Sequence, residues 1–424
     1  MGVILVVSFI ALLIAGTPIA LSIGVSAMLV LALSGMPLEA LPQTLFAGAN
    51  SFALVAVPFF ILAGDILAQG GISERIVAFA EATLGRIRGG LSIVSIVASM
   101  FIAAISGSGA ATTAAVGSAL LPQLKQKGYD LDFSAALIAA AGTIGVVIPP
   151  SVPMVLYAVI AGIPVSRLFL AGFVPGFLMG GILIVYALYV ARKRNYPASE
   201  KVDFRAKMKL FANALWGIMT PVLILGGIFS GYFTPSEAAA VAVVYSLFVA
   251  LFVYRALDFK KLYRLVVNAG VTSSLIMFII ATSKIFGWQL AFYRIPDKVA
   301  SAVLSVTGGV SGMVYLVIVA LILVAGMFME TASALVILTP IFLPAIMGIG
   351  GNLVHFGIIV TVGLAIGMAT PPVAIDIYVA SAITGLSLEE ISRPIIPMII
   401  ALIAVCLLIT YFPALSLFLP GLMR

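Results

Sequence analysis

The chain has 424 residues, of which 63% are hydrophobic and only 9% are charged, and its mean hydropathy is +1.27. So small a charged fraction excludes a soluble globular protein of this length. The formal net charge of +7 does not indicate nucleic-acid binding, because the basic residues cluster in short loops, as they do on the cytoplasmic side of membrane proteins.

Apolar stretches long enough to cross a bilayer recur along the whole sequence, and each crossing needs roughly 20 residues. Alternating barrel strands are absent, so we expect an all-α polytopic protein of the lipid bilayer. Met1 leads directly into an apolar run without a basic segment, and no cleaved signal peptide is expected. The single Cys406 excludes a disulfide framework, and the single His355 excludes a metal site of several histidines.

The first unusual element is a hairpin predicted over residues 91–121. Basic residues flank it on both sides, so both of its ends should lie in the cytoplasm. Two full crossings would need roughly 40 residues plus a turn, and the segment is shorter. It therefore fits a re-entrant hairpin with its tip at residues 106–109, Ser-Gly-Ser-Gly. The flanking residues are Arg86, Arg88, Lys125 and Lys127.

A broken helix is predicted over residues 133–160. Pro149 and Pro150 cannot donate a backbone hydrogen bond and clash with the preceding turn, and nearby glycines add freedom. The half-helix that ends near Gly145 would present carbonyl groups to a cation, and the half-helix that begins near Ser151 would present amides to an anion. A plain proline kink is the alternative interpretation.

A basic linker over residues 192–209 is expected to lie in the cytoplasm and to separate two repeats, residues 1–210 and 211–424. The second repeat has a predicted hairpin over 313–343, with its tip near Glu330, and a predicted broken helix over 353–380.

The two halves share landmarks at a constant displacement of 222 residues, and corresponding loops carry opposite charge bias. The pattern predicts two inverted-topology repeats whose broken helices form a transport site. The landmarks are Ala47-Gly48 with Ala269-Gly270, Pro122 with Pro344, Pro149-Pro150 with Pro371-Pro372, and Pro175 with Pro397.

Few side chains in the apolar segments carry chemistry. The small residues from Ser106 to Thr113 offer hydroxyl and backbone oxygens to a hard cation such as sodium, although small residues also line helix interfaces. Glu330 is an intramembrane carboxylate and hence a candidate site residue. Asp376 is a weaker candidate, Asp65 is interpreted as a helix-end residue, and Lys284 is interpreted as reaching the membrane interface.

Four motifs, in this order and with this spacing, resemble the large membrane subunit of TRAP (tripartite ATP-independent periplasmic) transporters, over the entire chain. That family consists of bacterial inner-membrane secondary transporters that import organic acids, typically four-carbon dicarboxylates or sialic acids. The motifs are Ser106-Gly-Ser-Gly, Gly145-Val-Val-Ile-Pro-Pro-Ser, Gly326-Met-Phe-Met-Glu-Thr and Gly367-Met-Ala-Thr-Pro-Pro.

The resemblance implies coupling to two or more sodium ions, no organic cofactor and an elevator mechanism. It also implies two partners, a small membrane subunit, expected here as a separate chain because no extension precedes Met1, and a periplasmic substrate-binding protein. One implied sodium site comprises Ser106, Ser108, Gly142 and Gly145. The second comprises Gly326, Thr331, Gly367, Met368 and Thr370. The substrate would lie near Ser108, Ser151 and Glu330.

We therefore expect a sodium-driven importer subunit for an organic acid and not an enzyme. A stand-alone sodium/carboxylate symporter with the same repeats is one alternative. An intramembrane serine protease is a remote one, because residues 106–109 are similar to the serine motif of rhomboid-type proteases. That motif needs Gly at position 106, and His355, the sole possible base, is expected on the far side of the second hairpin.

Overall fold

A computed structural model describes residues 1–199 and 202–422, and the elements found there are helices, which confirms the predicted all-α class. The first half contains α1 (Gly2–Ile14), α2 (Ile19–Leu33), α3 (Ala40–Ala49), η1 (Phe52–Val55), α4 (Ala56–Gln69), α5 (Ile72–Leu84), α6 (Gly90–Ser106), α7 (Gly109–Gln126), α8 (Leu131–Gly142), η2 (Thr143–Val146), α9 (Val152–Ala161) and α10 (Val165–Lys193). The second half contains α11 (Phe204–Phe229), α12 (Pro235–Phe248), η3 (Val249–Val253), α13 (Phe259–Phe292), α14 (Ile295–Thr307), α15 (Ser311–Gly326), α16 (Thr331–Gly348), α17 (Leu353–Met368), α18 (Ile375–Thr384), α19 (Leu388–Tyr411) and α20 (Ala414–Leu422).

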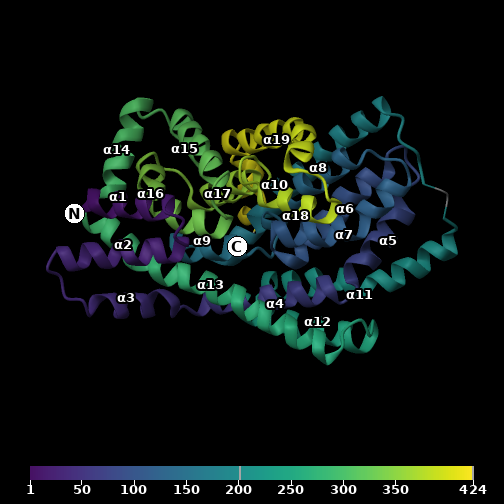
Figure 1. Cartoon of the computed structure of the whole chain (residues 1–424), viewed down its shortest axis with the longest axis horizontal. Helices are drawn as coiled ribbons and strands as arrows, with labels where there is room; N and C mark the ends of the chain where they lie inside the picture. Colours follow the sequence, from purple (N-terminus) through teal and green to yellow (C-terminus); the bar gives the residue numbers. More distant parts are fainter. Residues whose placement is uncertain (200–201, 423–424) are drawn as a thin grey trace.

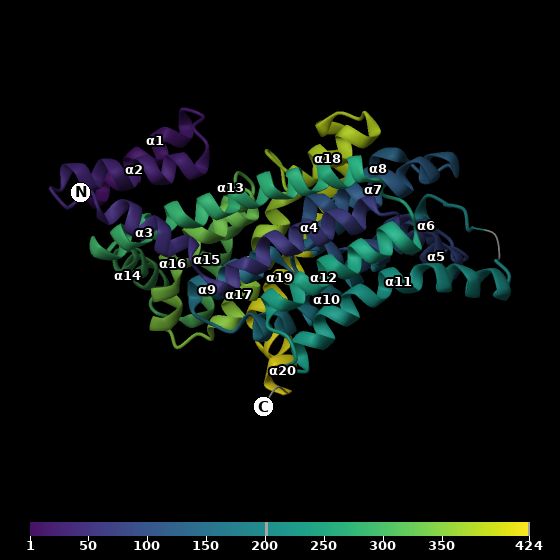
Figure 2. The same ribbon diagram turned by 90° about the horizontal axis from the view of Figure 1, so that it is seen from below.

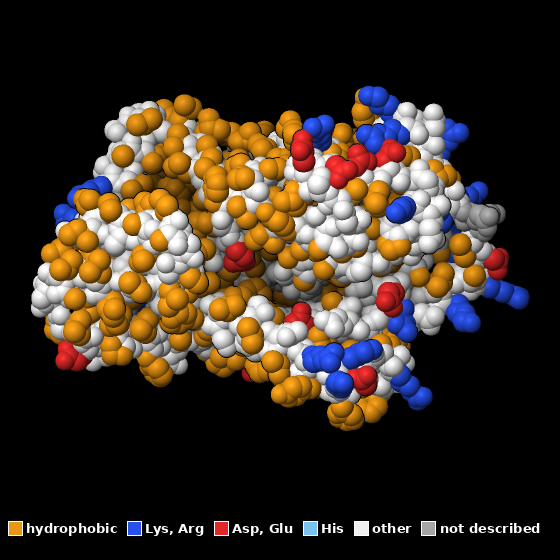
Figure 3. All heavy atoms as spheres, viewed as in Figure 1, with side chains coloured by type: hydrophobic (Ala, Val, Ile, Leu, Met, Phe, Trp, Pro, Cys, Tyr) orange, Lys and Arg blue, Asp and Glu red, His pale blue; other side chains and the backbone are white. Residues whose placement is uncertain are grey.

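Seven helical segments within the described ranges are long and apolar enough to cross a membrane, and α13 alone has 34 residues. Large apolar side chains are exposed over much of the surface, as a lipid-facing exterior requires. In Figure 3 most of the visible Lys and Arg side chains gather at the end of the molecule that carries α5, α8 and α11. This distribution agrees with the predicted cytoplasmic side.

The structure contains both predicted hairpins and both predicted helix breaks. α6 and α7 form the first hairpin, and α15 and α16 form the second. α7 begins at Gly109 and α16 at Thr331, so the 222-residue displacement found in the sequence also relates the helices. Both proline pairs lie in breaks, Pro149-Pro150 before α9 and Pro371-Pro372 before α18, and both have cis peptide bonds. The re-entrant course and the opposite orientation of the repeats stay predictions.

Capping residues mark where helices begin at both hairpin tips and after the first break. The Ser108 side chain accepts a hydrogen bond from the amide of Ala111, and the Ser151 side chain accepts one from the amide of Met154. Glu330 accepts one from the amide of Ser333. Each bond satisfies an amide that the first helical turn leaves free. Gly107 has a φ of +60°, a conformation that favours glycine, which allows the chain to turn between α6 and α7.

The two repeats exchange their half-helices. α9, which follows the first break, packs against α16 and α17 of the second repeat, whereas α18, which follows the second break, packs against α7 and α8 of the first. Helices α4, α11, α12 and α13 lie together along the longest axis of the molecule, beside this intertwined unit (Figure 1 and Figure 2).

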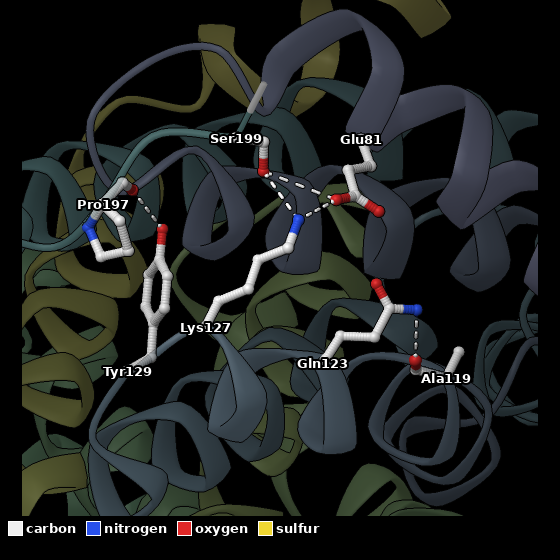
Figure 4. A network of polar contacts seen from close by, with 7 residues as sticks. All are labelled: Glu81, Ala119, Gln123, Lys127, Tyr129, Pro197 and Ser199. Carbon is white, nitrogen blue, oxygen red and sulfur yellow. Dashed lines mark hydrogen bonds and ion pairs between the residues drawn. The ribbon is translucent and has the colours of Figure 1, made fainter. Parts of the chain in front are cut away.

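The connection between the halves packs against the base of the first hairpin. Lys127 after α7 donates hydrogen bonds to Glu81 of α5 (Nζ–Oε1, 2.6 Å) and to Ser199 of the connection (Nζ–Oγ, 3.1 Å), while Tyr129 donates to the carbonyl of Pro197 (2.9 Å), as Figure 4 shows. The predicted linker over 192–209 is longer than the observed connection. α10 continues to Lys193 and α11 begins at Phe204, while residues 200–201 lie outside the described residues.

Candidate functional site

A cavity of about 400 Å³ lies where the two hairpin tips approach α4 and α13. The tips contribute hydroxyl, carboxylate and backbone groups, whereas α4 and α13 contribute mainly apolar side chains. The cavity thus joins the exchanged repeats to the long helices beside them. It is lined by Ile61, Gly64, Asp65, Ser106, Gly107, Ser108, Ala111, Val146, Val152, Pro153, Thr272, Leu275, Ile276, Ile279, Glu330, Ala332, Ser333 and Met368.

The first hairpin tip concentrates oxygen atoms. The hydroxyls of Ser106 and Thr112 are 2.8 Å apart, and Thr112 also donates to the carbonyl of Ser108 at 2.8 Å. Ser106 is buried and Ser108 is half-buried at the cavity wall. Thr112 belongs to the small-residue cluster predicted to offer oxygens to a cation, but it was not among the ligands that the family resemblance implied.

Two glycines allow the first helix break to approach this tip. A Cβ on Gly145 would lie 2.6 Å from the Thr112 hydroxyl and 2.5 Å from the Ser108 carbonyl, which is closer than real Cβ contacts. A Cβ on Gly142 would collide with the Thr113 hydroxyl and lie 3.2 Å from the carbonyl oxygen of Gly109. The four residues of the first implied sodium site therefore lie together, and their hydroxyl and carbonyl oxygens suit a hard cation.

The second implied sodium site is also assembled across a break. Gly326, at the end of α15, approaches Gly367 of α17 so closely that a Cβ on Gly326 would lie 3.1 Å from the Gly367 Cα. The Thr331 hydroxyl donates to the Met368 sulfur at 2.8 Å, and both residues are buried. Thr370 lies in the break itself, where its hydroxyl donates to the carbonyl of Ile366 at 2.7 Å.

Two acidic side chains line the cavity, and no basic side chain of the described residues lies opposite them. Asp65 and Glu330 both line it, and within the described part of the chain no Lys, Arg or His is among the lining residues. The interpretation of Asp65 as a helix-end residue is wrong, because Asp65 lies inside α4 and faces the cavity. Whether Asp65 lines a cavity depends on which segments pack against α4, and the sequence around Asp65 does not indicate those segments.

Two predicted or discussed residues lie away from this cavity. Ser151 is fully buried, and its hydroxyl donates to the carbonyl of Val146 at 2.6 Å while it caps α9. A direct contact between Ser151 and substrate therefore stays a prediction. Lys284 of α13 lines a separate cavity of about 500 Å³ that also includes Gly48 and Trp288.

A family model described as "Tripartite ATP-independent periplasmic transporter, DctM component" matches residues 6–415. The chain belongs to this family. It is 42% identical over 402 residues to the C4-dicarboxylate TRAP transporter large permease protein DctM of Pseudomonas aeruginosa, covering 94% of each chain. It is 34% identical over 416 residues to the sialic acid TRAP transporter large permease protein SiaM of Vibrio cholerae, covering 98% of this chain and 97% of the relative.

Another relative is longer than this chain. The isethionate TRAP transporter permease protein DctMQ of Oleidesulfovibrio alaskensis is 40% identical over 415 residues, which cover 97% of this chain and 65% of the relative. The chain thus spans about two thirds of that protein. Among solved structures, the Alcanivorax borkumensis YdaH transporter matches with a TM-score of 0.65 and 14% identity over 89% of each chain. At that identity the likeness concerns the fold alone.

The family consists of transporter permease subunits and not of enzymes, as predicted. The positions of His355 and Ser106 also argue against the intramembrane protease. The Nδ1 atom of His355 is 2.7 Å from the Ser416 hydroxyl, and its Nε2 atom is 3.2 Å from the carbonyl of Thr410. Ser106 instead pairs with Thr112, so the histidine is not the hydrogen-bond partner that a serine nucleophile requires.

Proposed function

We propose that this chain is the large permease of a TRAP transporter and imports a small organic anion across a bacterial inner membrane in symport with sodium. Four-carbon dicarboxylates and sialic acids are the leading substrate classes, and isethionate, a sulfonate, belongs in the same panel because three similar permeases are named for these compounds. The observation that carries the proposal is the cavity between the two hairpin tips, which contains Ser108 and Glu330.

The charge of the cavity supports coupling to cations. In their ionised form, Asp65 and Glu330 would repel an organic anion, and within the described range no basic residue lines the cavity to offset them. In a medium of low dielectric constant such repulsion is strong. Cations bound at the oxygen-rich positions beside the cavity would reduce this repulsion. Sodium binding before substrate binding follows from this charge balance.

The position of the cavity supports an elevator mechanism. Its walls come from two units: the intertwined hairpins and broken helices on one side, and α4 with α13 on the other. Movement of the intertwined unit along α4 and α13 would carry the site between the two membrane faces. Because α9 and α18 pack on hairpins of the opposite repeat, both hairpins would move as one body.

Membership of this family supports the expectation of two protein partners, a small membrane subunit and a periplasmic binding protein. We propose that a small membrane subunit completes the long helices that do not move and that a periplasmic binding protein delivers the substrate. The name DctMQ of the longer relative suits a permease in which both membrane components share one chain. A stand-alone symporter is the competing proposal, and dependence of uptake on a soluble binding protein separates the two.

Uptake by reconstituted protein tests these proposals. The full chain, co-expressed with its candidate small subunit, is placed in proteoliposomes and given radiolabelled succinate, sialic acid or isethionate, with and without the candidate binding protein. An inward sodium gradient should start uptake of one compound, and a potassium gradient should not. Equal uptake with either gradient would reject sodium coupling, and uptake without the binding protein would favour the stand-alone symporter.

A further inference from the structure

Asp376 is a fully buried carboxylate in the first turn of α18. Neither of its oxygens has a hydrogen-bond partner among residues 1–199 and 202–422. The three ion pairs found in the same ranges all lie elsewhere. Burying a charge is costly unless an opposite charge or several hydrogen bonds compensate it, so this carboxylate requires an explanation.

Asp376 faces the first repeat, because α18 packs mainly against α7 and α8. The Asp376 Oδ2 atom and the carbonyl oxygen of Gly142 each lie 3.3 Å from the position that a Cβ on Gly109 would take. The Thr113 hydroxyl lies beside Asp376 and beside Gly142. It is also fully buried and forms no hydrogen bond with good geometry in the described chain.

The contact between α9 and α16 is the counterpart of the contact between α18 and α7, and it shows which side chains are sufficient for packing there. At the displacement of 222 residues, Asp376 corresponds to Met154 and Thr113 corresponds to Leu335, and both counterparts are fully buried. Two apolar side chains thus fill the equivalent contact. The polar pair is therefore not needed to hold the helices together, and a ligand is the simpler explanation.

We infer that Asp376, the Thr113 hydroxyl and the Gly142 carbonyl form a sodium site at the junction of the two repeats. Carboxylate, hydroxyl and carbonyl oxygens are the ligands that hard cations prefer. Asp376 and Thr113 lie side by side without a hydrogen bond of good geometry, and a cation between their oxygens would compensate both. The site shares Gly142 with the first site implied by the family resemblance. It differs from both implied sites because its carboxylate ligand, Asp376, comes from the opposite repeat.

The inference builds on the proposed sodium coupling and assigns the bound ion a mechanical role. An ion held by Asp376 and Thr113 ties the half-helix of the second repeat to the first hairpin. Without it, the uncompensated carboxylate would weaken that contact. Sodium should therefore stabilise the protein even when no substrate is present.

Sodium-dependent stability tests the site without any transport assay. The full chain in lipid nanodiscs is melted at increasing NaCl, balanced with choline chloride at constant ionic strength. The melting temperature of the native protein should rise as the sodium concentration rises. Asp376→Asn should raise the sodium concentration for half of that gain by about tenfold or more, because it removes the charged ligand. Asp297→Asn, an exposed acid in the first turn of α14, is the matched control and should behave as native.

A second variant keeps the test decisive if Asp376→Asn does not fold. Thr113→Val retains the shape of the side chain, removes the hydroxyl and should also weaken the sodium response. An unchanged sodium titration in Asp376→Asn, or in Thr113→Val if the first variant cannot be purified, would overturn the site while leaving the proposed coupling intact. Native protein without any sodium response would count against both proposals.

Discussion

Ser108 and Glu330 occupy equivalent positions 222 residues apart, and each is the N-cap of the second helix of its hairpin. Both line the central cavity. The same structural position thus carries a hydroxyl in one repeat and a carboxylate in the other. The cap explains why each side chain is held at the tip, and the difference in charge makes the two ends of the site chemically distinct.

Glu330→Gln should separate the capping role of this residue from its charge. The glutamine oxygen can still accept from the amide of Ser333, so folding should be retained. Loss of the charge should raise the sodium concentration needed for half-maximal uptake and lower the initial rate by about tenfold, equivalent to about 1.4 kcal/mol. Glu389→Gln, exposed at the start of α19, should transport as native. Native sodium dependence in Glu330→Gln would contradict a role for its charge.

Thr112→Val should weaken the first sodium site without reshaping the hairpin. The substitution removes the hydroxyl that contacts Ser106 and the Ser108 carbonyl, each at 2.8 Å. Sodium affinity, measured from uptake at saturating substrate, should fall by about three- to tenfold, which corresponds to one lost oxygen ligand or hydrogen bond. Thr83→Val is a suitable control because Thr83 is exposed and its hydroxyl bonds only to the carbonyl of Phe79 in the same helix. Equal sodium affinity in both variants would remove Thr112 from the site.

Gly145→Ala should block the approach of the first break to the hairpin tip. The added methyl group would occupy space held by the Ser108 carbonyl and the Thr112 hydroxyl. We expect a loss of roughly 1–3 kcal/mol in stability from overpacking and a near-complete loss of uptake. Gly181→Ala, at an exposed place in α10 with open space around it, should be neutral or slightly stabilising. Thermal melting and uptake of both variants provide the comparison, and normal transport by Gly145→Ala would refute the close approach.

The connection between the halves should loosen in acid. Hydrogen bonds from Tyr196 and Arg194 hold the pKa of Asp130 below its ordinary value. A lowered pKa stabilises the folded state above the ordinary pKa, near about pH 4, and this stabilisation is lost as the pH falls through the folded-state value. Because Asp130 is exposed, the effect should be at most about 1 kcal/mol.

Asp130→Asn tests this acid effect by proteolysis. The variant should be cleaved between α10 and α11 at neutral pH about as readily as native protein is cleaved at low pH. Asp297→Asn should retain the native pH profile, since Asp297 lies in α14 and away from the connection. Identical cleavage of Asp130→Asn and native protein across the pH range would contradict the assignment.

Hairpins and helix breaks are predictable from the sequence because glycine, proline and small polar residues mark them locally, and because the marks occur twice. The tip at Ser106–Gly109 and the break at Pro371–Pro372 both coincide with helix ends in the structure. The predicted linker is too long because basic residues at both of its ends are part of the adjoining helices: Arg192 and Lys193 end α10, and residues 204–209 begin α11. Charge alone does not end a helix.

Features that depend on packing between distant segments were not predictable. Nothing around Asp65 indicates that α4 would face the hairpin tips, where this carboxylate lines the cavity. Likewise, Ser151 follows the prolines as expected and caps α9 locally, but only the assembled chain shows that it is fully buried and does not line the cavity. Single-sequence patterns define a helix and its faces, whereas the partner of each face is a property of the assembled chain.

The exchange of α9 and α18 between the repeats has an evolutionary consequence. A polypeptide with one repeat alone would leave α7 or α16 without the half-helix that covers it. Such a polypeptide would need a second copy to contribute that half-helix, so a one-repeat ancestor would have been an obligate dimer. Joining the copies in one chain would free equivalent positions to differ, as Met154 and Asp376 do.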